Sequence, residues 1–133
     1  MEVILNSKTI ISLGAGRVGM SIRAFTMRLG HMGLKAFMIG DTTVPSIGKD
    51  DLLLVASGSG ETQTIFDLTL TAHLAGAKIA LITSNRESRM AKLANLVVVL
   101  PAPSKNGSAN SKSVQPMTTL NEQSLLIFFD ALV

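Results

Sequence analysis

The sequence predicts a doubly wound, three-layer αβα sandwich around a five-stranded parallel sheet. Short aliphatic runs alternate with segments of helical periodicity, and turn residues separate them. Strands without polar alternation are buried on both faces, and a strand–helix alternation implies right-handed crossovers between parallel strands. With 133 residues, of which 47% are hydrophobic and 16% charged, the chain is expected to form one domain over residues 1–133.

The first half of the chain predicts three strands and one long helix. Residues 9–13 form a mostly apolar run that ends in Gly14, and residues 17–32 place Met20 and Met27 at helical spacing. Residues 34–39 and 52–56 predict two further strands, because both are largely apolar and a turn-rich stretch separates them.

The second half continues the alternation. Residues 61–75 have helical spacing and precede Gly76, which is typical of a helix end, and residues 78–82 predict a strand. Ser84 and Glu87 have the spacing of a capping box, which predicts a short helix to about residue 94. Residues 96–100 are almost wholly aliphatic and predict a buried fifth strand. Residues 101–115 predict a loop, and residues 119–132 a last helix.

Composition excludes several classes of function. The chain has no cysteine, which rules out disulfides, thiolate metal ligands and a cysteine nucleophile. No apolar run reaches the roughly 18 residues of a membrane span. The net charge of +3 is dispersed, and there is no Trp or Tyr to stack on bases. We therefore expect a cytoplasmic protein that binds neither membranes nor nucleic acid.

Two glycine-rich turns at the carboxyl ends of strands are candidates for anion binding, since ligands of such sheets bind at that edge. Residues 14–19 read G-x-G-x-x-G, and Asp41 follows the second strand. This pattern fits a dinucleotide fingerprint with Asp41 on a ribose hydroxyl, but also a tight strand-to-helix turn that simply needs glycine.

The second turn, residues 57–62, is more informative. Ser57, Ser59 and Thr62 surround a helix N-terminus with hydroxyl groups, and two glycines allow close backbone approach. Amides and hydroxyls in this arrangement favour a phosphate group. Helix capping is the alternative, although it requires only one such side chain.

The pattern Ser-x-Ser-Gly-Glu-Thr after a middle strand resembles the phosphosugar-binding loop of the SIS (sugar isomerase) domain family. With residues 14–17, 42–51, 82–85 and 115–126, it makes the chain most similar, within that family, to the 6-phospho-3-hexuloisomerases. The resemblance implies a flavodoxin-like fold and interconversion of 3-hexulose 6-phosphate and fructose 6-phosphate in the ribulose monophosphate pathway of formaldehyde assimilation. It further implies no nicotinamide or metal, and a homo-oligomer, dimer or tetramer, with shared active sites.

The resemblance also implies roles for individual residues. Substrate is expected on Ser57, Ser59, Thr62 and Asn85, on the amides of Gly58 and Gly60, and on Gly16 and Arg17 at the sugar end. Glu122 is expected to be the acid/base and His31 to assist it. One carboxylate suffices, because a carbonyl shift through a cis-enediol returns the proton on the same face. Both catalytic residues have structural alternatives: Glu122 completes a capping box with Thr119, and His31 suits a helix C-terminus.

The sequence departs from the family at several points. Val18 replaces a usual Ser, and Thr118 and Asn121 replace a usual Gly and Phe. Only residues 1–7 precede the first strand, so we expect a single SIS domain without the family's N-terminal helices. Two other functions stay open: a non-catalytic phosphosugar sensor, which would not need Glu122, and a nicotinamide-binding protein that uses residues 14–19.

Overall fold

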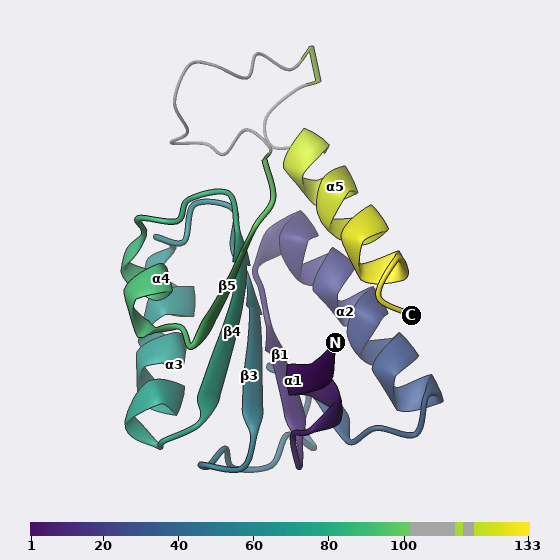
Figure 1. Ribbon diagram of the computed structural model, residues 1–133, viewed down its shortest axis with the longest axis vertical. Helices are drawn as coiled ribbons and strands as arrows, with labels where there is room; N and C mark the ends of the chain where they lie inside the picture. Colours follow the sequence, from purple (N-terminus) through teal and green to yellow (C-terminus); the bar gives the residue numbers. More distant parts are fainter. Residues whose placement is uncertain (102–113, 116–118) are drawn as a thin grey trace.

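The computed structural model describes residues 1–101, 114–115 and 119–133 (Figure 1). The predicted loop at 101–115 therefore lies almost wholly outside the described residues, and so does Thr118. No helix in the described ranges is long and apolar enough to cross a membrane. The elements, in chain order, are α1 (Glu2–Leu5), β1 (Ile10–Leu13), α2 (Gly16–His31), β2 (Ala36–Met38), β3 (Leu52–Ala56), α3 (Gln63–Leu74), β4 (Lys78–Thr83), α4 (Arg89–Leu93), β5 (Leu96–Val99) and α5 (Thr119–Asp130).

The five strands form one parallel sheet in the order β2-β1-β3-β4-β5. The predicted fold class is therefore confirmed, including the flavodoxin-like strand order. From β1 the chain first moves outward to β2, then returns past β1 to β3 and continues the other way to β5. Because right-handed crossovers in opposite directions place their helices on opposite faces, the sheet is covered on both sides.

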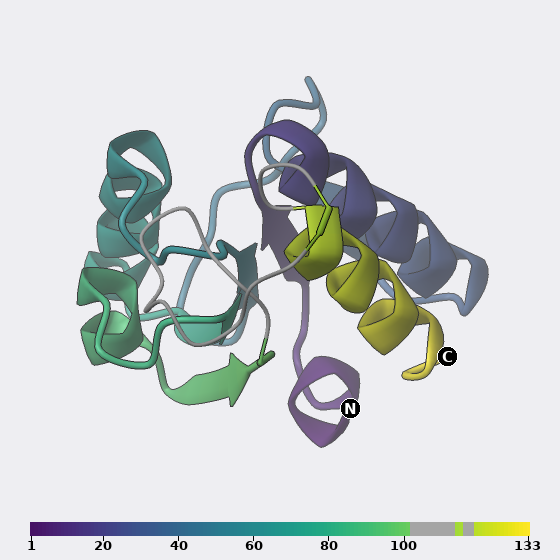
Figure 2. The same ribbon diagram turned by 90° about the horizontal axis from the view of Figure 1, so that it is seen from above.

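Two hydrophobic clusters fill the space between the three layers. Helices α2 and α5 cover one face of the sheet, and α3 and α4 cover the other (Figures 1 and 2). Along β3, Leu52 and Leu54 belong to the cluster under α2 and α5, while Leu53 and Val55 belong to the cluster under α3 and α4. This alternation explains why the middle strands are aliphatic throughout.

Helices α2 and α5 are held together by aromatic packing. The rings of Phe25 and Phe129 stack with centroids 4.5 Å apart, and both side chains are buried. This contact fixes the last helix of the chain against the first long one. As a result, the N-terminal turns of α2 and α5 lie near each other at the carboxyl edge of the sheet (Figure 2).

Two sequence expectations about elements are wrong, and one element was not expected. Helix α4 begins after Ser88, whose Oγ accepts a hydrogen bond from the amide of Ala91, and not at a capping box of Ser84 and Glu87. Strand β5 is partly exposed, with Leu96 at 43%, because it is an edge strand with one free side. The one-turn helix α1 was not expected; it buries Ile4 against the α2 side of the core.

Candidate active site

A pocket of about 280 Å³ lies at the carboxyl ends of β1 and β3. The chain leaves these adjacent strands in opposite directions, which opens a crevice where ligands of such sheets bind. Its walls are the first turn of α2, the loop between β3 and α3, and the first turn of α5. The lining residues are Ala15, Gly16, Arg17, Val18, Ala56, Ser57, Gly58, Ser59, Thr62, Ile65, Asn121 and Glu122.

The loop of residues 57–62 forms a wall of hydrogen-bond donors. The Oγ of Ser57 accepts from the amide of Gly60, and the Oγ of Ser59 accepts from the amide of Glu61, both at 3.2 Å. Each serine therefore keeps its hydroxyl proton for another acceptor. Thr62 is the N-cap residue of α3, but its side chain makes no capping bond. Simple helix capping therefore does not account for the three hydroxyl groups.

Backbone amides of the same loop are also available. Among the hydrogen bonds of the described residues, none uses the amide N–H of Gly58, Ser59 or Thr62. The first-turn amides of α3 add further donors, because an α-helix leaves its first amides without internal partners. A phosphate group accepts hydrogen bonds from such a cluster and is favoured by the positive end of the helix dipole.

Gly60 has a different role from the one expected. Its amide is already bonded to Ser57, and it is absent from the pocket lining. It adopts a positive φ of 64°. A Cβ at this position would collide with the side chain of Ser88. Gly60 therefore shapes the loop against α4 and offers no amide to a ligand.

The back of the loop is fixed by Glu61, Arg89 and Asn85. Glu61 accepts from the amide of Arg89 at 2.8 Å and pairs with its guanidinium at 2.7 Å. The hydrogen bond from the Arg89 amide, followed by the one from its side chain, lowers the pKa of Glu61. The Arg89 guanidinium also lies 4.3 Å from the ring centre of Phe66. Asn85 donates to the carbonyl of Ser59 at 3.2 Å and lies outside the pocket lining, so it supports the loop from behind.

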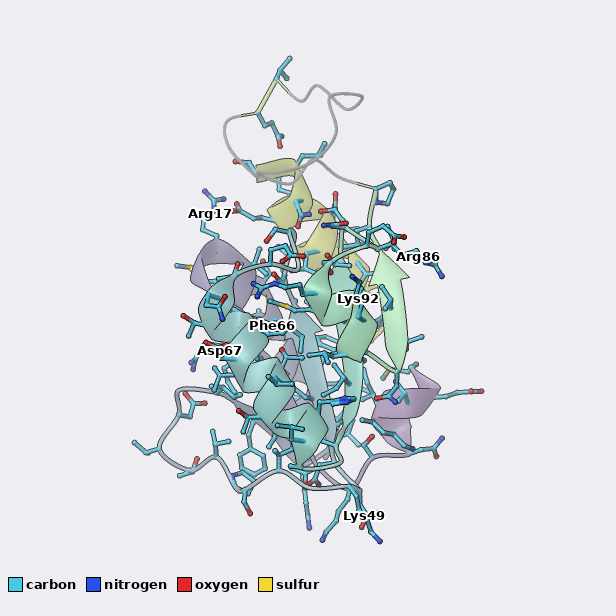
Figure 3. All side chains as sticks on the ribbon, turned by 90° about the vertical axis from the view of Figure 1, so that its left-hand side faces the viewer. Arg17, Lys49, Phe66, Asp67, Arg86 and Lys92 are labelled. Atoms are coloured by element: carbon cyan, nitrogen blue, oxygen red, sulfur yellow. The ribbon has the colours of Figure 1, made fainter. Side chains whose placement is uncertain are left out.

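The opposite wall carries an ion pair. Arg17, in the first turn of α2, lies with its Nε 2.7 Å from Oε2 of Glu122, in the first turn of α5. The Glu122 side chain is 11% exposed and that of Arg17 is 65% exposed, so the carboxylate lies inside the pocket and the guanidinium at its rim. Figure 3 shows Arg17 at the end of the molecule away from Lys49, which precedes β3. Gly16 begins α2 with a φ of 57°.

His31 does not reach this pocket. It is exposed and ends α2, fifteen residues after Gly16, which at 1.5 Å per residue is about 22 Å away. Within one chain the predicted partnership with Glu122 is therefore ruled out by the length of the helix.

The dinucleotide features have structural explanations. A Cβ on Gly19 would lie 2.7 Å from the carbonyl oxygen of Gly14, so these glycines allow α2 to pack closely on the end of β1. Asp41 forms an ion pair of 2.8 Å with Arg23, outside the pocket lining.

Sequence reasoning missed three apolar residues of the pocket, Ala15, Ala56 and Ile65. Asn121 and Val18 were noticed only as departures from the family. The position of Asn121 directly before Glu122 at a helix start was the signal that could have identified it.

Comparisons with known proteins identify the family of the chain. The SIS domain model matches residues 3–127. The chain is 40% identical to a 3-hexulose-6-phosphate isomerase of Bacillus subtilis, over 98% of this chain and 71% of the relative. A protein of the same name from Mycobacterium gastri is 43% identical over 96% of this chain, which spans 64% of the relative's length.

Solved structures share the fold. A Methanococcus jannaschii protein, for which its structure inferred a function of 3-hexulose-6-phosphate isomerase, superimposes with a TM-score of 0.88 at 34% identity, over 98% of this chain and 70% of that one. The Vibrio vulnificus NanR protein complexed with ManNAc-6P has a TM-score of 0.76 at 20% identity, over 98% of this chain and 49% of that one. The latter likeness shows a common fold only.

Proposed function

This chain belongs to the SIS domain family, and we propose that it is an isomerase that interconverts 3-hexulose 6-phosphate and fructose 6-phosphate. One observation carries the proposal: the carboxylate of Glu122 lies in the same pocket as the hydroxyl-rich loop of residues 57–62. The names of relatives at 40% and 43% identity support the substrate class.

In this proposal the phosphate binds to the loop of residues 57–62. The hydroxyl groups of Ser57, Ser59 and Thr62 donate to its oxygens, together with the free loop amides and the N-terminus of α3. The sugar then extends across the pocket toward Arg17 and Glu122. Fixing the charged end in this way makes proton transfer at the other end effectively intramolecular.

Glu122 moves the proton. Starting from fructose 6-phosphate, its carboxylate takes the proton from C3, and the electrons of that bond form a C2–C3 double bond as negative charge develops on O2. The same carboxyl group returns the proton to C2, while the proton of O3 passes to O2 and C3 becomes the carbonyl carbon. One base therefore serves both carbons, as a cis-enediol requires.

Arg17 stabilises the intermediate. When Glu122 takes up the proton it loses its negative charge, and that charge appears on the enediolate oxygen. The guanidinium, 2.7 Å from the carboxylate at the start, is then next to the new negative charge. A fixed donor near developing charge is one of the strongest contributions that an active site makes to rate.

The finer parts of the proposal rest on the family resemblance. We retain His31 only as a residue that contributes to the pocket of a second subunit, within a homotetramer with shared sites. The ribulose monophosphate pathway and a cytoplasmic location belong to the same proposal.

The two other functions are less well supported. A phosphosugar sensor needs the loop of residues 57–62 but no carboxylate opposite it, and Glu122 lies there. A nicotinamide-binding protein needs residues 14–19 and Asp41 for its cofactor, whereas close packing and an ion pair with Arg23 account for them.

Exchange in deuterated water tests the proposal directly. The protein is incubated with fructose 6-phosphate, and NMR follows deuterium at C3 and the appearance of the 3-ketose. Glu122→Gln should abolish both, because the amide cannot accept the proton. Glu87→Gln removes the same charge from an exposed position outside the pocket lining and should retain both. Unchanged sugar with folded wild-type protein would refute the isomerase, and a fully active Glu122→Gln variant would refute the base.

A further inference from the structure

Asn121 is a buried polar side chain directly before Glu122. It lines the pocket and is 4% exposed. Its Nδ2 donates to the Oγ of Ser84, in the turn after β4, at 2.8 Å. A buried amide paired in this way is held in one orientation, because rotating it would leave its N–H without a partner.

The hydrogen bond continues to the loop of residues 57–62. The Oγ of Ser84 donates to the carbonyl of Gly58 at 2.9 Å. Since the hydroxyl has a single proton, Ser84 can only accept from Asn121. A chain of donors thus runs from α5 through Ser84 to Gly58. The Asn121 amide also packs on Gly58, where a Cβ would lie 3.2 Å from its Nδ2.

We propose that Asn121 is a positioning residue that fixes Glu122 relative to the loop of residues 57–62. This proposal rests on the proposed function. When the loop holds the phosphate, the chain of bonds between the phosphate and carbons C2 and C3 limits how far these carbons can lie from the loop. The first turn of α5 must therefore be held at a matching distance from Gly58.

The ion pair of Glu122 with Arg17 differs from the hydrogen bond of Asn121. Its guanidinium is 65% exposed, and exposure to water reduces what an ion pair contributes to position or stability. The bond between Asn121 and Ser84 is shielded by burial, so breaking it leaves unpaired groups inside the protein. This bond therefore ties the first turn of α5 to the loop side of the pocket.

The loop itself does not depend on Asn121. The carbonyl of Gly58 also accepts from the amide of Ser84 and from the Oγ1 of Thr83, both at 3.1 Å. These bonds keep the loop attached to β4 when Asn121 is replaced. Replacing Asn121 should therefore lower turnover more than it weakens phosphate binding. If Asn121 had a purely structural role, its replacement would impair both to the same extent.

The test compares Asn121→Leu and Asn121→Asp with Gln123→Leu, an exposed amide of α5 outside the pocket lining. Exchange with fructose 6-phosphate in deuterated water gives kcat and KM, and competition by inorganic phosphate gives its inhibition constant. Both Asn121 variants should lower kcat about 10- to 100-fold, as expected for a base displaced by about 1 Å, and in Asn121→Leu, which adds no charge, the phosphate constant should change less than about threefold. Asn121→Asp should lose turnover too, because its carboxylate takes the Ser84 proton away from Gly58. Gln123→Leu should match the wild type.

The outcomes separate the two proposals. Wild-type protein without exchange refutes the proposed function and this inference with it. If the wild type is active and Asn121→Leu has a normal kcat, the positioning role is refuted while the proposed function stands. An equal loss of turnover and phosphate affinity in Asn121→Leu refutes the positioning role in the same way. If Asn121→Leu does not fold, Ser84→Ala breaks the same chain without altering α5, and a normal kcat in that variant overturns the inference.

Discussion

Gly60→Ala should destabilise the protein more than the same substitution at another left-handed glycine. Gly60 has a φ of 64°, is buried, and lies against Ser88, the N-cap residue of α4. A Cβ there would collide with Oγ and Cβ of Ser88 and lie 3.4 Å from the Oγ1 of Thr83. Gly33 has a φ of 84°, yet an added Cβ meets no atom within 4 Å.

The difference can be estimated from two costs. A non-glycine residue in the left-handed region costs about 1 to 2 kcal/mol, and both alanine variants incur this cost. Alanine recovers about 0.4 to 1 kcal/mol by restricting the unfolded chain. Only Gly60→Ala adds overpacking, at about 1 to 3 kcal/mol. We therefore expect Gly60→Ala to lower the free energy of unfolding by about 1 to 4.5 kcal/mol, and Gly33→Ala by about 1.5 kcal/mol or less.

Urea unfolding followed by far-UV circular dichroism measures both values, since the chain has no Trp or Tyr for fluorescence. Ser88→Gly removes both colliding atoms, so the double variant Gly60→Ala/Ser88→Gly should lose less stability than the two single changes combined. Equal free energies of unfolding for Gly60→Ala and Gly33→Ala would refute the close contact between the loop and α4.

Two further predictions concern the same loop. Thr62→Ala should weaken binding of inorganic phosphate about five- to tenfold by removing a donor. Thr64→Ala changes an exposed threonine two residues further along and should leave this affinity unchanged. Calorimetric titration measures both affinities, and equal values for the two variants would exclude Thr62 from the site. The hydrogen bonds from Arg89 lower the pKa of Glu61. The stability that this pair adds should therefore be present above pH 4.5 and disappear as the pH falls through the lowered pKa. Urea unfolding of wild type and Glu61→Gln should therefore converge on acidification, and a constant difference would contradict the role of this pair.

Local pattern was sufficient to predict the sheet and one wall of the pocket. The middle strands are unbroken aliphatic segments, so their positions were evident, and Leu52–Ala56 was predicted to the residue. The loop of residues 57–62 could be recognised because three hydroxyl side chains exceed what a helix cap needs. Its place at the pocket then followed from the rule that carboxyl strand ends share one edge.

The remaining site features depend on contacts between distant segments. Ser84 was assigned to a capping box because its spacing to Glu87 fits, yet its hydroxyl bonds to Gly58 and Asn121, 26 and 37 residues away. The amide of Gly60 bonds to Ser57, only three residues away, but the contact of Gly60 with Ser88 joins two segments, and no local pattern reveals that contact. His31 is different, since the predicted helix over residues 17–32 already placed it at the far end from Arg17. The length of that helix was enough to exclude it from its own chain's pocket.

Binding and chemistry are assigned to different parts of the chain. In the proposed function, the donors for phosphate come from one continuous segment between β3 and α3, whereas the carboxylate comes from α5, the last element. The position of Glu122 opposite that segment depends on the packing of α5 on α2 and on the bond from Asn121 to Ser84. Changes at Glu122 or Asn121 should therefore lower turnover more than they weaken phosphate binding. In this proposal, the segment between β3 and α3 would suffice for a protein that only binds a phosphosugar. Isomerisation also needs the carboxylate that α5 places opposite that segment.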